Sequence, residues 1–119
     1  MHTDTSPTLL VTGGAGFIGS HIATELLQNG YHIRILDNLT PRMHGPDRRE
    51  PGHLDRRAEV VVGDIRDPHR LREALDGIDT VIHLAAVVGE RSSMYRIEKY
   101  LSVNTSGTAV LLEALLDHP

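Results

Sequence analysis

Four short apolar segments divide this chain, and each is followed by glycine, by proline or by a stretch with helical periodicity. They are TLLVTG (residues 8–13), HIRILD (32–37), EVVVGD (59–64) and DTVIHLAA (79–86). Short, near-continuous runs of aliphatic and β-branched residues are typical of strands that are buried on both faces. The pattern therefore predicts four strands of a covered sheet.

Helical periodicity fills most of the intervals between these strands. From residue 16 to 29 an apolar stripe is predicted to face the core, and Gly30 then ends the helix. In DPHRLREAL, Asp67 stands at the N-cap position and Pro68 at the first helical position, which predicts a second helix start. The residues of the first stripe are Ile18, Ile22, Leu26 and Leu27.

Two longer segments complete the pattern. Residues 38–57 contain three prolines and two glycines and predict one long loop, which at this length is usually functional or mobile. Residues 92–117 predict a final helix. The apolar face expected for that helix consists of Val103, Val110, Leu111, Leu112, Leu115 and Leu116.

The order of these elements predicts an α/β fold. Strands that alternate with helices form a parallel sheet with crossover helices on its faces. Right-handed crossovers and doubly wound topology give the strand order 3-2-1-4, with a ligand at the carboxyl ends of strands one and four. We therefore expect the N-terminal half of a Rossmann-type doubly wound sheet over residues 1–119, truncated before strand five.

Composition and charge exclude several classes of function. The 119 residues carry a net charge of −4, so no global basic field attracts nucleic acid or an anionic membrane. The absence of cysteine excludes disulfides and thiolate metal sites, and no two of the eight histidines stand four residues apart. There is no apolar run of membrane-spanning length and no signal-peptide pattern at the start. A cytoplasmic protein without a metal site is therefore expected.

The segment TGGAGFIGSH (residues 12–21) fits a dinucleotide-binding pattern in two registers. One places glycines at 14, 16 and 19, and the other at 13, 16 and 19. Such glycines permit a tight turn, a close approach of the backbone to a pyrophosphate, and close packing of helix against strand. The helix that starts here directs N–H groups at phosphates. A tight turn with a purely structural role is the alternative interpretation.

An acidic residue follows at the end of the second strand. Asp37 lies eighteen positions beyond Gly19. A carboxylate there can accept hydrogen bonds from both hydroxyls of the adenosine ribose, and it repels a 2′-phosphate. This arrangement favours NAD over NADP, although Asp37 can also be read as a turn residue at a strand end.

With these residues in view, a family resemblance becomes visible. The segments TGGAGFIGSH, LDNL, GDIRD, HLAA and VNTSGTAVLLEAL, in this order, resemble the extended short-chain dehydrogenase/reductases. Within that superfamily they are similar to the NAD-dependent epimerase/dehydratase family, which acts on nucleotide sugars. The resemblance runs from residue 9 to residue 116.

The resemblance implies contacts between the chain and NAD. The glycines are implied to lie against the pyrophosphate, and the two residues after Gly16 to donate backbone N–H groups to it. Asp37 and Asn38 are implied to hold the adenosine ribose, and Asp64 and Ile65 to meet the adenine edge. Leu84, Ala85 and Ala86 are implied to let the cofactor lie across the sheet. From the residues alone, Asp64 can also be read as a turn residue and Ala85 and Ala86 as plain packing. The implied cofactor residues are Gly13, Gly16, Phe17, Ile18, Gly19, Asp37, Asn38, Asp64, Ile65, Leu84, Ala85 and Ala86.

The catalytic half of the family's site is not expected in this chain. In the family a Tyr-x-x-x-Lys pair stands on the helix after strand five, whereas Tyr95 and Lys99 in YRIEK precede Asn104 with no strand between. We interpret YRIEK as a coincidence. Asn104 matches a helical asparagine that supports the catalytic lysine. No catalytic residue is therefore assigned here, and no catalysis by the chain alone is expected.

Three hypotheses for function follow. The chain is the NAD-binding portion of a nucleotide-sugar epimerase or dehydratase, whose complete form transfers hydride transiently at sugar C4 of a dTDP- or UDP-hexose. Alternatively, it is a free-standing, non-catalytic nucleotide-binding module, or a decayed remnant without a ligand. Because strand four would be an exposed edge, a homodimer or other self-association is expected, and a complete family member is expected to dimerise through the helix ending in LLEALL.

Overall fold

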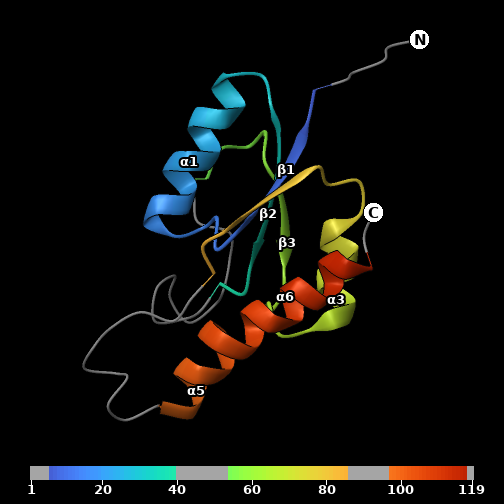
Figure 1. The fold of residues 1–119 in the computed structure, drawn as a ribbon. Helices are drawn as coiled ribbons and strands as arrows, with labels where there is room; N and C mark the ends of the chain where they lie inside the picture. Colours follow the sequence, from blue (N-terminus) through green and yellow to red (C-terminus); the bar gives the residue numbers. More distant parts are fainter. Residues whose placement is uncertain (1–5, 40–53, 86–96, 118–119) are drawn as a thin grey trace.

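The computed structural model describes residues 6–39, 54–85 and 97–117. Strands and helices alternate along these ranges, as the apolar pattern predicts (Figure 1). The strands are β1 (Thr8–Thr12), β2 (His32–Asp37), β3 (Glu59–Val62) and β4 (Thr80–His83). The helices are α1 (Phe17–Gln28), α3 (Pro68–Leu75), α5 (Ile97–Leu101), the π-helix η1 (Ser102–Ser106) and α6 (Gly107–Leu116).

All the strands of the described sheet run parallel, in the order β3-β2-β1-β4. This confirms the predicted order 3-2-1-4. Thr12, the last residue of β1, lies level with Leu36 of β2 and with His83 of β4. The carboxyl ends of these three strands therefore meet at one edge of the sheet, which is where a doubly wound fold binds its ligand.

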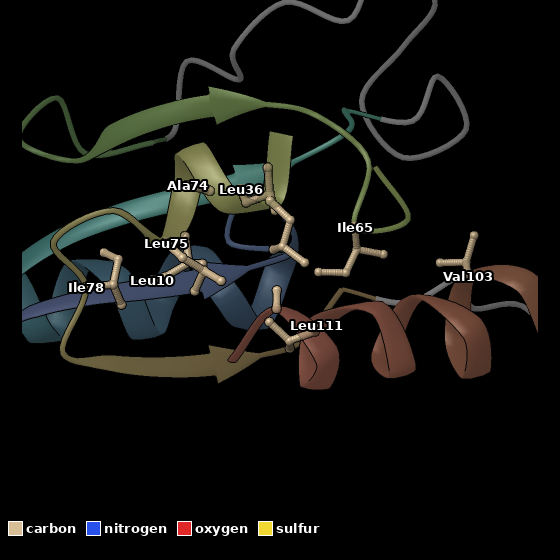
Figure 2. Close-up of a cluster of buried hydrophobic side chains, with 10 residues drawn as sticks. Leu10, Leu36, Ile65, Ala74, Leu75, Ile78, Val103 and Leu111 are labelled. Atoms are coloured by element: carbon tan, nitrogen blue, oxygen red, sulfur yellow. The ribbon is translucent and has the colours of Figure 1, made fainter. Parts of the chain in front are cut away.

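Helices cover both faces of the sheet. Figure 1 shows α1 on one side and α3 and α6 on the other, with α5, η1 and α6 forming one continuous rod. Successive residues of β1 point to opposite faces: Leu9 and Val11 pack in the cluster that includes α1, and Leu10 packs against α3 and α6 (Figure 2). Since both faces are buried, the strands need the nearly continuous apolar sequence that they have.

The start of α3 agrees with the sequence. The Asp67 side chain accepts hydrogen bonds from the N–H groups of His69 and Arg70, and Pro68 occupies the first turn. These are the N-cap and first-position preferences on which the prediction depended. The far end of α3 is held by Arg34 of β2, whose guanidinium donates to the carbonyl oxygens of Ala74 and Asp76 at 2.8 and 2.6 Å.

Three apolar residues expected in the core lie outside it. Ile18 of α1 is 62% exposed, and Leu112 and Leu116 of α6 are 59% and 85% exposed. The face of α1 that packs on the sheet is instead made by small residues, Gly19, Ser20 and Ala23, together with Leu27. The predicted stripe for α1 was therefore wrong at Ile18, because the helix start approaches the sheet too closely for a larger side chain.

The strands also end earlier than the apolar pattern suggested. β3 stops at Val62 and β4 at His83, so Asp64, Leu84 and Ala85 belong to connecting segments. One backbone hydrogen bond follows each of these strands, from the Gly63 N–H to the Asp37 carbonyl at 3.0 Å and from the Leu84 N–H to the Thr12 carbonyl at 3.0 Å, and the strand pairing then ends. Part of the predicted loop (residues 40–53) and the start of the predicted final helix (residues 92–96) lie outside the described residues.

Candidate functional site

The glycine turn leaves β1 at the edge where the strand ends meet. Gly13 has a φ of +71°, which favours glycine, and its N–H donates to the Leu36 carbonyl at 2.8 Å. A Cβ on Gly13 would lie 2.9 Å from backbone atoms of Leu84 and Ala85. The turn therefore packs directly on the segment that follows β4, and no larger residue fits there.

The turn closes onto the first turn of α1. The Gly16 N–H donates to the Gly13 carbonyl at 3.1 Å, and the Ser20 N–H donates to the Gly16 carbonyl at 2.9 Å. A Cβ on Gly19 would lie 2.5 Å from the Gly13 carbonyl oxygen and 2.7 Å from Gly14 Cα. Gly13 and Gly19 thus meet backbone atoms, and a Cβ on Gly14 would meet the buried Ile35 side chain at 2.8 Å and the Val11 carbonyl oxygen at 3.1 Å. The close packing at these glycines is compatible with both glycine registers.

Phe17 and Ile18 stand at the start of α1 with their side chains in solvent, 79% and 62% exposed. The first N–H groups of a helix have no partner within the helix, and the helix dipole makes this end favourable for anions. The backbone N–H groups of these two residues can therefore donate hydrogen bonds to an anion while their side chains remain exposed to solvent. Phe17 also makes an edge-to-face contact with the His21 ring, at 4.9 Å between centroids.

Asp37 connects the second strand to the glycine turn. Its carboxylate is 8% exposed; Oδ2 accepts from the Ala15 N–H at 3.0 Å, and Oδ1 accepts from the Leu39 N–H at 2.8 Å. Leu39 is fully buried with a φ of 52°, an uncommon conformation for leucine that the bond to Asp37 helps to hold. The Asp37 carboxylate therefore closes a turn at the end of β2 and also bonds to the glycine turn.

Asp64 follows β3 and is paired with an arginine that the sequence analysis did not single out. Arg66 donates from Nε to Oδ1 at 2.9 Å and from Nη2 to Oδ2 at 2.6 Å, and its backbone N–H donates to Oδ1 at 2.8 Å. The Arg66 guanidinium lowers the pKa of the Asp64 carboxyl, which keeps it an acceptor. The spacing Asp-x-Arg in GDIRD is the feature of the sequence from which this ion pair could have been predicted. The neighbouring Ile65 is buried in the core.

The structure places the remaining predicted residues as follows. Leu84 and Ala85 come directly after β4, with Leu84 37% exposed, and Asn38 is half-buried next to Asp37. Asn104 lies exposed in the π-helix η1, and Lys99 lies on α5. Ala86 and Tyr95 are outside the described residues, so the geometry of the YRIEK pair is not seen.

Residues 6–39, 54–85 and 97–117 contain neither a metal site nor a membrane-spanning helix. No group of three or more histidine, cysteine, aspartate or glutamate side chains in that part of the chain could hold a metal ion. None of the helices described there is long and apolar enough to cross a membrane.

The sequence of this chain is similar to those of known nucleotide-sugar enzymes. The sequence profile of the NAD dependent epimerase/dehydratase family matches residues 9–119. The UDP-N-acetyl-alpha-D-glucosaminuronate decarboxylase of Bacillus cytotoxicus is 34% identical over 107 residues, which is 90% of this chain and 32% of that protein. The dTDP-L-rhamnose 4-epimerase of Burkholderia thailandensis is 37% identical over 112 residues, or 92% of this chain and 31% of that protein.

Solved structures agree with the sequence relatives. The crystal structure of UDP-glucose 4-epimerase from Brucella ovis in complex with NAD superposes with a TM-score of 0.78 and 37% identity. The match covers 92% of this chain and 32% of that structure. The chain thus spans about a third of the length of the relatives that it matches, and the shared third is the part that carries the glycine turn.

Proposed function

The chain belongs to the NAD dependent epimerase/dehydratase family, and we propose that its glycine turn, Asp37 and Asp64 bind the ADP-ribose half of NAD. The observation that carries this proposal is the buried Asp37 carboxylate, which is bonded to the N–H of Ala15 inside the glycine turn. The turn and the acid are thereby held as one unit at the carboxyl ends of β1 and β2. A dinucleotide needs both features side by side, since its pyrophosphate and ribose are adjacent.

Each part of the unit has a role in the proposal. Gly13, Gly16 and Gly19 let the backbone approach the pyrophosphate, and the N–H groups of Phe17 and Ile18 donate to it. The N-terminal end of α1 contributes a favourable dipole, and no side chain intrudes because both of these residues face solvent.

The ribose and adenine lie further along the edge in this proposal. Asp37 accepts hydrogen bonds from the ribose hydroxyls, with Asn38 beside it. Asp64, kept ionised by Arg66, accepts from the exocyclic amine of adenine, and the Ile65 backbone meets the ring edge. The exposed Leu84 and the adjoining Ala85 and Ala86 line the path of the cofactor past β4. Asn104 supports the site from η1.

The reaction of a complete family member is also a proposal for this chain. When bound, NAD supplies a hydride acceptor, and the substrate class is a nucleotide sugar, a dTDP- or UDP-hexose. Relatives with UDP and dTDP sugars in their names support that class. Residues 1–119 would provide the NAD-binding portion, in the cytoplasm. A homodimer through the helix rod is part of the same proposal, with the exposed Leu112 and Leu116 on its outer side.

Calorimetric titration with NAD, NADP and ADP-ribose tests the proposal. Asp37→Ala would remove both backbone hydrogen bonds of the carboxylate, so its loss of binding could come from a distorted turn. The sharper comparison is the ratio of NAD to NADP affinity in the wild type and in Asp37→Asn. Asp76→Asn is the matched control, because Asp76 is an exposed residue at the end of α3 and the change removes the same charge.

We expect NAD and ADP-ribose to bind the wild type and Asp76→Asn, with NADP about tenfold weaker or more, because a phosphate meets a carboxylate. In Asp37→Asn the ratio should fall to within about threefold, since the repulsion is gone. A wild-type chain that is folded by circular dichroism and binds none of the three ligands would instead support the remnant hypothesis.

A further inference from the structure

A chain of hydrogen bonds crosses the edge of the sheet beside the glycine turn. Thr12 Oγ1 accepts from the backbone N–H groups of Leu84 and Ala85 at 2.9 and 3.1 Å and lies 2.7 Å from His83 Nδ1. The Leu84 N–H is shared with the Thr12 carbonyl oxygen at 3.0 Å. The other ring nitrogen of His83, Nε2, lies 3.0 Å from Thr108 Oγ1. The Thr108 hydroxyl donates in turn to the Asn104 carbonyl at 2.9 Å. This hydrogen-bond network thus joins β1, the end of β4, α6 and η1.

Counting donors and acceptors shows which atom donates the proton in each hydrogen bond of this network. A hydroxyl has one proton and two lone pairs. Because Thr12 Oγ1 accepts from two N–H groups, its own proton must go to His83 Nδ1. The ring proton then sits on Nε2 and is donated to Thr108, which passes its own proton to the Asn104 carbonyl. The network therefore requires neutral His83 in the Nε2–H form.

The doubly protonated ring does not fit this arrangement. A proton on Nδ1 would remove the acceptor of the Thr12 hydroxyl proton and would compete with the N–H groups of Leu84 and Ala85 for the lone pairs of Oγ1. Burial acts in the same direction, because it lowers the pKa of His83. Within residues 6–39, 54–85 and 97–117, each polar side-chain atom that is buried has a hydrogen-bond partner.

The hydrogen-bond network holds in place the segment after β4, against which the glycine turn packs. Backbone atoms of Leu84 and Ala85 lie 2.9 Å from where a Cβ of Gly13 would be, so a small shift after β4 would be felt directly in the turn. At the other end, Asn104 lies in η1, where the Gly107 N–H bonds to the Ser102 carbonyl in the i→i−5 pattern. Single π turns of this kind occur often at functional sites.

We propose that His83 is a positioning residue: as the neutral Nε2–H tautomer it connects Thr12 to Thr108, and so holds the end of β4 against the glycine turn. The significance of this for cofactor affinity rests on the proposed NAD-binding function. The histidine does not touch the cofactor in this proposal; it acts through Thr12 on Leu84 and Ala85.

The test uses the ¹⁵N-labelled chain and a pair of variants on α6. Thr108→Val keeps the shape of the side chain but removes the hydroxyl, and Thr108→Ser keeps the hydroxyl. Long-range ¹H–¹⁵N correlation spectra report which ring nitrogen of His83 carries the proton. Hydrogen exchange at the Ala85 amide reports whether the end of β4 is held. His83→Asn, which keeps an acceptor near the Nδ1 position but no Nε2 donor, checks the effect from the other side.

We expect a single Nε2–H tautomer at neutral pH in the wild type and in Thr108→Ser. In Thr108→Val and His83→Asn, exchange at Ala85 should be about threefold to tenfold faster and ADP-ribose affinity lower by a similar factor, the equivalent of one hydrogen bond. Thr108→Ser should restore both values.

Two results would overturn the proposal: an Nδ1–H or mixed tautomer in the wild type, or equal Ala85 exchange in Thr108→Val and Thr108→Ser. Failure of the wild type to bind ADP-ribose, with the tautomer and exchange as expected, would contradict only the NAD-binding function. The positioning of the β4 end by His83 would then still be supported, because neither of those readouts requires a ligand.

Discussion

Replacing Gly19 by alanine tests the packing of the glycine turn, because two effects of known size oppose each other there. In a helix, alanine is more favourable than glycine by about 1 kcal/mol. However, the new Cβ would lie 2.5 Å from the Gly13 carbonyl oxygen and 2.7 Å from Gly14 Cα. Both atoms belong to the backbone, so no side-chain rotation relieves the overlap.

The distances indicate which effect is larger. Carbon makes ordinary contacts at about 3.5 Å, so the turn would have to open by about 1 Å. Overpacking of a well-packed site typically costs about 1–3 kcal/mol, and a rigid backbone on the far side favours the upper part of that range. We therefore expect Gly19→Ala to lower the free energy of unfolding by about 1–2 kcal/mol after the gain in helix propensity.

Gly107→Ala provides the matched control in α6. There the new Cβ would meet the γ2 methyl of the buried Ile65 side chain at 2.7 Å, whereas the Ser102 carbonyl oxygen lies 3.7 Å away. The same gain in helix propensity should bring this variant to within about 1 kcal/mol of the wild type. The two variants thus share a chemical change and differ in whether a side chain or the backbone has to yield.

Urea denaturation followed by circular dichroism measures both variants, and the slope of the transition should be unchanged in each. Titration with ADP-ribose should show a loss of affinity in Gly19→Ala, because the turn is the proposed pyrophosphate site. If Gly19→Ala were as stable as the wild type, the close approach of α1 to the glycine turn would be refuted.

Three further predictions concern single side chains. Asp37→Asn keeps one oxygen, so only one of the N–H groups of Ala15 and Leu39 retains its acceptor; chemical denaturation should show a loss of about 1.5–3 kcal/mol. Leu111→Ala in the core should cost about 2–5 kcal/mol, whereas Leu112→Ala, on the exposed side of the same helix, should stay within about 0.5 kcal/mol in the same assay. Burial lowers the pKa of His83, so its contribution to stability is complete above the unfolded value of about 6.5 and is lost as the pH falls through the folded value. The melting temperature of the wild type relative to His83→Gln should therefore decrease between pH 7 and pH 5, and parallel curves for the two proteins would contradict this.

Much of the fold follows from interactions between residues that are close in the sequence. The apolar runs locate the four strands, and Asp67 with Pro68 marks the start of α3, because an N-cap acts on N–H groups two and three residues away. The glycine pattern likewise identifies the turn after β1, since its hydrogen bonds join residues three and four apart. Patterns of this kind can be read without knowing how the chain packs.

The burial of individual leucines required the tertiary structure. Leu111 and Leu112 are neighbours in one apolar run, yet one is in the core and the other is 59% exposed. A helix with apolar residues on several sides does not indicate which side meets the sheet. In this chain the side that meets the sheet carries Leu111 and Ala114, which pack with Leu10 of β1 and with the buried residues of α3.

The sequence by itself determined the strands, the strand order, the glycine turn and the acid beside it, because local patterns and the rules of chain connection are sufficient for these. Only the tertiary structure decided the partners of the polar side chains. Arg66 lies two residues from Asp64 but also reaches Ser102, and Thr12 meets His83 across 71 positions of the chain. Such pairs form because the carboxyl ends of parallel strands converge at one edge of the sheet, and the hydrogen-bonding demand of buried groups then selects among the neighbours that the fold brings together.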